Sequence, residues 1–78
     1  MGVLKNLALT MAQAVVSEPK EVRVEEVEGS SMVVIELSVS TNDMGRIIGK
    51  EGRVANAMRT LLRTSAAKDG KRVSLEII

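Results

Sequence analysis

The sequence predicts a small α+β domain in which three helices cover one face of a three-stranded mixed sheet. Helical and alternating hydrophobic patterns follow one another in the order α-β-β-α-α-β, and 78 residues leave no room for a second core. A short polar turn joins the first two strands, which predicts an antiparallel hairpin. About thirty residues separate the second strand from the third, and such a helical crossover favours a parallel pair. We therefore expect residues 1–78 to form one domain.

Residues 3–16 have the hydrophobic period of an amphipathic helix. Its expected core stripe consists of Leu4, Leu7, Met11 and Val15, with Ala8 beside it. The helix ends before Pro19, because the residue preceding a proline is disfavoured in the α region. Val22 and Val24 then alternate with charged residues, as in a strand with one face in solvent.

The second strand is expected at residues 32–39, after a polar turn at residues 28–31. We place it in the centre of the sheet, because Met32 and Val34 make its second face partly apolar. Residues 40–43 all favour helix N-caps and predict a short helix that Gly49 ends after Ile48. A longer helix begins just past Gly52 and closes at Asp69-Gly70, and residues 73–77 alternate as the third strand. The stripe expected to face the core in the long helix is Val54, Ala57, Met58, Leu61, Leu62 and Ser65.

Three residue classes are absent, and each absence excludes a class of function. No cysteine means no disulfide, thiolate metal site or cysteine nucleophile, and no histidine removes the commonest metal ligand and general base. No Phe, Trp or Tyr excludes nucleic-acid binding by base stacking on aromatic rings. Asp43 and Glu51 are the only carboxylates near the central glycines, and no acid–base constellation accompanies them. We expect no catalysis, metal, cofactor or small-molecule substrate.

The chain is also expected to lack a membrane segment. Its longest apolar run, Met32 to Ile35, is far shorter than the roughly 18 residues that a membrane helix needs. Ala12-Gln13-Ala14 resembles a signal-peptidase site, but the apolar stretch before it is broken at Thr10. We therefore expect a cytoplasmic protein.

The formal net charge of +1 conceals an uneven distribution. Residues 1–44 hold three basic and seven acidic side chains, for a net charge of −4, whereas residues 45–78 hold eight basic and three acidic ones, for +5. Arg59 and Arg63 fit the solvated side of an amphipathic helix. Arg46, Lys50 and Arg53 instead crowd around two glycines and fit that interpretation less well.

Gly49 and Gly52 are the most informative pair. A helix that ends at one glycine and restarts at the other presents free N–H groups and the positive end of a helix dipole, which suit a phosphate. The missing side chains let a sugar-phosphate backbone approach closely, and Lys50 and Arg53 add positive charge. Glu51 opposes a phosphate unless it points into solvent or caps the next helix. The spacing fits neither a Walker A loop nor a Rossmann fingerprint. A purely structural helix corner, or a helix-turn-helix bound to duplex DNA, stays open.

The run from Asp43 to Arg53 resembles the signature of the KH domain, with its Ile-Gly-x-x-Gly core. With the element order, which covers essentially the whole chain, it is similar to the type II, prokaryotic KH fold and to the small bacterial KhpA family. The resemblance implies that the glycine loop grips about four single-stranded nucleotides, of RNA or of single-stranded DNA. Bases would lie between the short helix, the start of the long helix and the sheet edge, where Val54 is a further candidate. The site residues that it implies are Gly45, Arg46, Ile48, Gly49, Lys50, Glu51, Gly52 and Arg53.

The family also implies partners and a cellular role. It suggests an RNA chaperone or post-transcriptional regulator, acting as a homodimer or with a larger KhpB-like RNA-binding protein, and linked in some bacteria to cell elongation and division. A loop at residues 67–71 would carry Lys68 and Lys71 toward the nucleic acid. Pairing surfaces offered by the sequence are the sheet face with Met32 and Val34, and the first-helix residues Leu9 and Val16. The alternative is a protein-assembly factor whose nucleic-acid contact is incidental.

Overall fold

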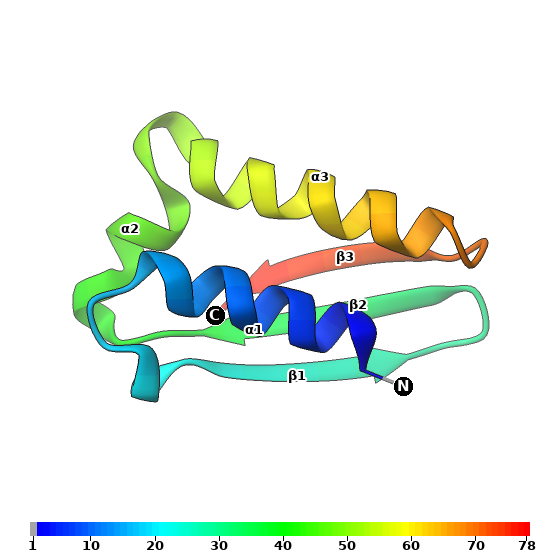
Figure 1. Cartoon of the computed structure of the whole chain (residues 1–78), viewed down its shortest axis with the longest axis horizontal. Coiled ribbons are helices and arrows are strands. Elements are labelled where there is room, and N and C mark those ends of the chain that lie inside the picture. Colours follow the sequence, from blue (N-terminus) through cyan, green and yellow to red (C-terminus); the bar gives the residue numbers. More distant parts are fainter. Residues whose placement is uncertain (1) are drawn as a thin grey trace.

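The computed structural model describes residues 2–78, so the expected domain start at Met1 lies outside it. The predicted order of helices and strands is confirmed, with three additional one-turn 3-10 helices (Figure 1). The helices and strands are α1 (Val3–Val15), β1 (Arg23–Glu28), β2 (Met32–Ser38), α2 (Met44–Ile48), α3 (Arg53–Ala67) and β3 (Arg72–Ile77). The 3-10 helices are η1 (Pro19–Glu21), η2 (Thr41–Asp43) and η3 (Lys50–Gly52).

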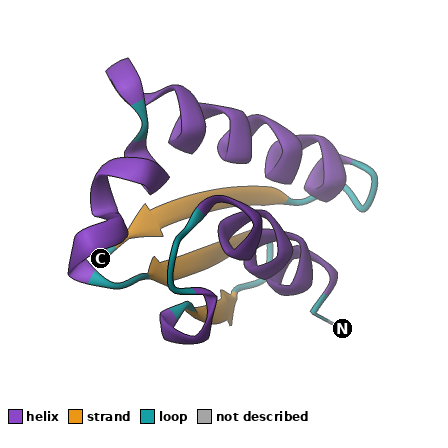
Figure 2. Ribbon diagram, turned by 60° about the vertical axis from the view of Figure 1, so that its left-hand side comes forward, coloured by secondary structure: helices purple, strands orange, loops and turns teal. Residues whose placement is uncertain are grey.

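The sheet has the order β1-β2-β3, with β2 in the centre as predicted. β1 pairs antiparallel with β2, and β2 pairs parallel with β3, so Ile35 lies between Glu26 and Leu75. Alternate residues of β2 are buried beneath the helices, namely Val33, Ile35 and Leu37. The helices lie over this one face, which makes the domain a two-layer α+β sandwich (Figure 2).

The helices contact the sheet through smaller residues than the sequence suggested. α1 buries Ala8 and Ala12 completely, whereas Leu4, Leu7 and Met11 are only half-buried around them. The buried residues of α3 are Ala55, Met58, Leu62 and Ala66. The expected stripe of α3 is therefore wrong at Ala57 and Leu61, which are exposed. Alanines let each helix lie close to the sheet, and the larger apolar side chains are left at the flanks of the contact.

Two residues expected to be free for pairing also belong to the core. Val16 is 9% exposed, because the chain becomes extended directly after α1 and turns this side chain inward. Leu9 is half-buried and packs against the core cluster. Met32, in contrast, is 42% exposed on the uncovered face of the sheet. Within residues 2–78, no helix combines the length and the apolar character that crossing a bilayer requires.

Candidate nucleic-acid interface

The glycine loop joins α2 to α3 through a single 3-10 turn with left-handed backbone at three positions. Gly49 has φ 76° and ψ 170°, and Gly52 has φ 77° and ψ 13°. Glu51 lies between them at φ 58°, the only non-glycine residue with positive φ among those the structure describes. This backbone reverses the chain within four residues and sets α2 beside the start of α3 (Figure 1).

The two glycines are required for different reasons. A Cβ atom on Gly49 would lie 2.6 Å from Val54 Cγ2 and 2.8 Å from Val54 N. A Cβ atom on Gly52 would meet only the flexible end of Asn56, at 3.4 Å. Gly49 is therefore needed for the close approach of the loop to α3, and Gly52 chiefly for its backbone conformation.

The amide groups of the loop divide into bonded and free donors. Gly49 N–H donates to Gly45 O at 2.8 Å, and Gly52 N–H donates to Gly49 O at 3.1 Å. The N–H groups of Lys50 and Glu51 donate to no acceptor within residues 2–78. No side chain caps the N-terminus of α3, so the positive end of its dipole faces the same region. The apex of the loop thus offers unsatisfied donors to an anion.

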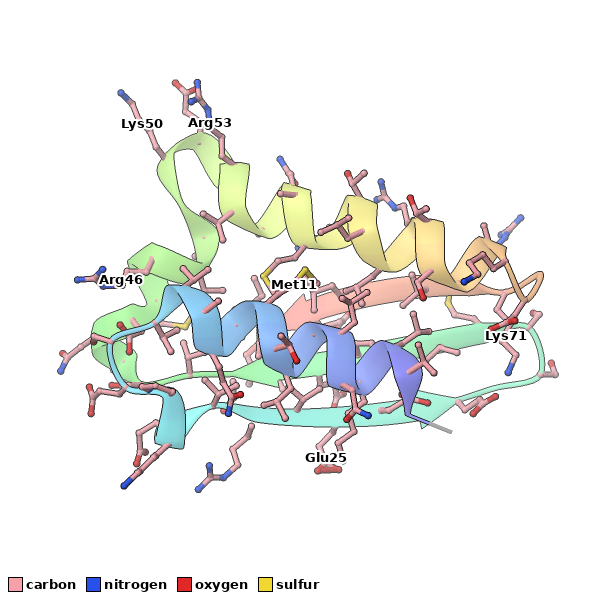
Figure 3. All side chains as sticks on the ribbon, in the orientation of Figure 1. Met11, Glu25, Arg46, Lys50, Arg53 and Lys71 are labelled. Carbon is pink, nitrogen blue, oxygen red and sulfur yellow. The ribbon has the colours of Figure 1, made fainter. Side chains whose placement is uncertain are left out.

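Three cations lie in the loop or on the helices that flank it. Lys50 and Arg53 are exposed and project outward from the loop, while Arg46 extends from α2 on the same side of the molecule (Figure 3). The Arg46 side chain is 62% exposed, with Nε 3.4 Å from Asp43 Oδ1. Glu51 is exposed and makes no capping bond to α3, so it does not fill the anion position.

Asp43 is fully buried, and its role differs from the helix cap that the sequence suggested. Oδ1 accepts hydrogen bonds from Ser17 N at 2.9 Å and Ser17 Oγ at 2.8 Å, and Oδ2 accepts one from Glu18 N at 3.1 Å. The Ser17 and Glu18 donors and the nearby Arg46 hold the pKa of this carboxyl below its usual value, although burial opposes them. Ser40 provides the local cap instead, through a bond from Asn42 N. Asp43 therefore anchors the start of α2 to the segment after α1.

The outer face of α2 continues the loop surface. Gly45 and Ile48 are exposed and lie three residues apart, hence on the same side of the helix. Ile48 is 43% exposed and available to a ligand, whereas its neighbour Ile47 is buried in the core. Val54 is half-buried and packs against the core.

A further feature that the sequence did not indicate lies between α3 and the edge strand β3. Arg59 is half-buried rather than simply solvated, and donates to Leu75 O at 3.5 Å and to Asn56 Oδ1 at 3.2 Å. Arg59 and Arg63 line a cavity of about 100 Å³ that lies between α3 and β3. Only the pairing of the strands, which makes β3 the edge, reveals this proximity.

The loop between α3 and β3 is tied to the hairpin. Lys71 forms an ion pair with Glu28, which raises the pKa of Lys71 and lowers that of Glu28. Lys68 is exposed and has no ion-pair partner among the described residues. Of the two lysines expected to reach a ligand from this loop, one is thus already paired.

A second surface, this one apolar, lies between α1 and α3. An open groove of about 400 Å³ separates the two helices. Leu61, expected in the core, is 51% exposed on its rim. The groove is lined by Met11, Ala14, Val15, Arg53, Val54, Ala57, Met58 and Leu61. It shares Arg53 with the glycine loop but is otherwise uncharged.

Comparison with known proteins adds to this geometry. Residues 5–77 match the family model described as "KhpA/KhpB, KH domain". A protein of Clostridium acetobutylicum named "RNA-binding protein KhpA" is 47% identical over 75 residues, which cover 96% of this chain and 100% of the relative. Its namesake in Aquifex aeolicus is 46% identical over 78 residues, covering 100% of this chain and 99% of the relative.

Among solved structures, the chain is similar to a part of Era. The structure of Era in complex with MgGDPNP and nucleotides 1506–1542 of 16S ribosomal RNA superposes with a TM-score of 0.67 at 26% identity. The match covers 95% of this chain but only 28% of that one. A second Era structure, from Aquifex aeolicus and bound to GDP.AlF4-, gives the same TM-score at 25% identity.

Proposed function

Because the chain belongs to the KhpA/KhpB family of KH domains, we propose that it is a non-catalytic module that binds single-stranded RNA through the loop from Gly49 to Gly52. The observation that carries the proposal is the pair of free amides at Lys50 and Glu51, in the loop from which the exposed side chains of Lys50 and Arg53 project (Figure 3). Relatives named for RNA binding favour RNA over single-stranded DNA.

In the proposed mechanism, one part of the surface binds the RNA backbone and another part contacts the bases. The loop amides and the α3 dipole bind a phosphate, and Lys50, Arg53 and Arg46 neutralise it and its neighbours. About four nucleotides then lie along the outer face of α2 and the start of α3, where Gly45 leaves room and Ile48 gives an apolar surface. The grip therefore acts on the backbone, and selectivity for bases is modest.

The small number of contacts limits the affinity. Two or three neutralised phosphates correspond to a slope of roughly −1.4 to −2 in a plot of log affinity against log salt, with affinity near micromolar. Low affinity and modest base selectivity suit an RNA chaperone or post-transcriptional regulator in the cytoplasm. Pairing with a second RNA-binding unit would raise the avidity for RNA.

Reversing the charge of the loop tests this proposal. We expect the double substitution Lys50→Asp with Glu51→Asp to weaken binding of a fluorescent single-stranded RNA by roughly tenfold to thirtyfold, because one phosphate contact is replaced by repulsion. The fold is expected to survive, since both side chains are exposed and aspartate tolerates the left-handed backbone at position 51. Fluorescence anisotropy gives the affinity, and circular dichroism and thermal melting report the fold.

The chain provides a matched control in a second Lys-Glu pair. Lys20→Asp with Glu21→Asp makes the same change in η1, which lies at the lower edge of Figure 1, whereas the loop lies at the upper edge. An equal loss of affinity in both double variants, or in neither, would contradict the loop mechanism. Competition with duplex DNA in the same assay tests the alternative of a helix-turn-helix bound to duplex DNA. That alternative requires the duplex to compete better than the single strand.

Protein assembly is the second candidate function, and the apolar groove between α1 and α3 favours it. We propose that this groove, with the exposed Leu61, pairs with a second copy or with a KhpB-like partner. Leu61→Asp should convert a self-associating wild type to monomer in analytical ultracentrifugation, because a carboxylate would be buried in the contact. Val27→Asp is the matched control, since Val27 is 56% exposed on the uncovered sheet face. Association that persists in Leu61→Asp would exclude this groove as the interface.

A further inference from the structure

We infer that RNA gripped by the glycine loop continues past the α3/β3 edge to one further nucleotide site at the start of β3. This inference rests on the proposed function and extends the same binding path. The site, called here the β3-start pocket, is an open volume of about 310 Å³. It is lined by Met32, Arg63, Lys71, Arg72 and Val73.

The pocket lies where three elements meet at the edge of the sheet. Met32 and Arg72 are direct neighbours in register, as the first residues of β2 and β3. Arg63 reaches the same pocket from α3, and Val73 forms part of its wall. The pocket therefore combines apolar side chains with two guanidinium groups, a combination that suits a nucleotide with its base against the apolar residues and its phosphate at the arginines.

A continuous polar path connects this pocket to the glycine loop. Positions 53, 56, 60 and 63 recur at three- and four-residue intervals along one side of α3 and carry Arg, Asn, Thr and Arg. Arg53 and Arg63 are ten residues apart, which corresponds to about 15 Å along the helix. Arg63 and Val73 line both the α3/β3 cavity and the β3-start pocket, so the two hollows adjoin.

The charges of the pocket are available to a ligand. Lys71 is paired with Glu28, whereas neither Arg63 nor Arg72 forms an ion pair within residues 2–78. The chain contains no aromatic ring on which a base could stack. The planar guanidinium groups of its arginines provide the surfaces for such stacking instead. Charge complementarity thus favours an anionic strand over an apolar protein segment, and the RNA gripped by the adjacent loop supplies such a strand.

A row of three glutamates limits how far RNA can extend along the sheet. Glu25, Glu36 and Glu76 are paired in register across the three strands, on the same sheet face as Met32 and Arg72. The row lies four residues farther along the strands, about 13 Å from the pocket. A phosphate that advanced along this face would meet three carboxylates, so the path ends in the β3-start pocket and adds only one nucleotide site.

Binding of short and long RNA by the same variants tests the inference. We expect Arg63→Gln with Arg72→Gln to weaken octauridylate binding about fivefold to tenfold and to leave tetrauridylate binding unchanged, because only the longer strand reaches the pocket. The salt slope for the octamer should become shallower by about 0.7 for each phosphate lost. The control Lys5→Gln with Lys20→Gln removes the same charge away from the path and should affect neither length. Equal weakening of both lengths, or of neither, would overturn the inference.

A chemical footprint gives an independent test that needs no loss of affinity. Since the chain lacks cysteine, Met32→Cys creates a single thiol in the pocket. Saturating octauridylate should slow its alkylation at least fivefold, whereas tetrauridylate should not, and Val27→Cys on the same face should react equally in all cases. Unchanged alkylation of Met32→Cys under octauridylate would refute the extended path while leaving the loop mechanism intact. If the wild type binds neither oligonucleotide, both proposals fail together.

Discussion

Replacing Gly49 by alanine is expected to destabilise the domain by about 3 kcal/mol and to lower its melting temperature by 10–20 °C. The backbone at φ 76° and ψ 170° belongs to a region that is almost exclusive to glycine. The added Cβ atom would also lie 2.8 Å from Val54 N, a backbone atom that cannot rotate away. The loop must therefore shift relative to α3, and the free amides at its apex shift with it.

The other glycines of this region provide graded controls. Gly52→Ala should cost about 1 kcal/mol, because its left-handed backbone is strained by a side chain but its Cβ atom meets only the movable end of Asn56. Gly45→Ala should be neutral or stabilising by up to about 1 kcal/mol, since Gly45 is in a helix with open space around it. Thermal and urea unfolding of the three variants should give this order. A Gly49→Ala protein as stable as Gly52→Ala would contradict the described loop geometry.

The fold was predictable from the sequence because its main signals are local. The alternation in residues 32–39 and the polar turn before it determine the hairpin, and the crossover length determines the parallel pair. The helix faces were less predictable. Ala8 and Ala12 make the closest contacts of α1, but hydrophobicity alone ranks the larger leucines above them. The same bias placed Leu61 in the core, whereas it lies on the rim of the α1/α3 groove.

The candidate site was predictable where it is contiguous in sequence and unpredictable where it depends on folding. Gly49 to Arg53 form one short segment whose backbone demands are visible in the residue types. The half-buried position of Arg59 follows only from the pairing of β3 at the sheet edge. The contact between Asp43 and Ser17 spans 26 residues. Nothing in residues 40–43 distinguishes this buried aspartate from the adjacent capping residues.

Asp43→Asn is the second substitution for which we expect a large effect. Glu18 N–H now faces a carboxylate oxygen, and an amide that keeps its oxygen toward Ser17 would present its NH₂ group to Glu18. Two donors would then oppose each other in a buried site, so we expect the melting temperature to fall by on the order of 10 °C at pH 7. Asp69→Asn is the matched control, because Asp69 is exposed in the loop before β3.

The pH dependence of this fall in melting temperature distinguishes loss of the buried negative charge from a general loss of packing. Because folding lowers the pKa of Asp43, the ionised carboxylate stabilises the folded state above its usual pKa of about 3.8, and this contribution disappears as the pH falls below that value. The difference in melting temperature between wild type and Asp43→Asn should therefore narrow between pH 5 and pH 2. A difference that stays constant over this range would contradict the assignment. Since Asp43 anchors the start of α2 and its Oδ1 lies 3.4 Å from Arg46 Nε, a narrowing difference would also link the ionised carboxylate to the helix that carries Arg46 and Ile48.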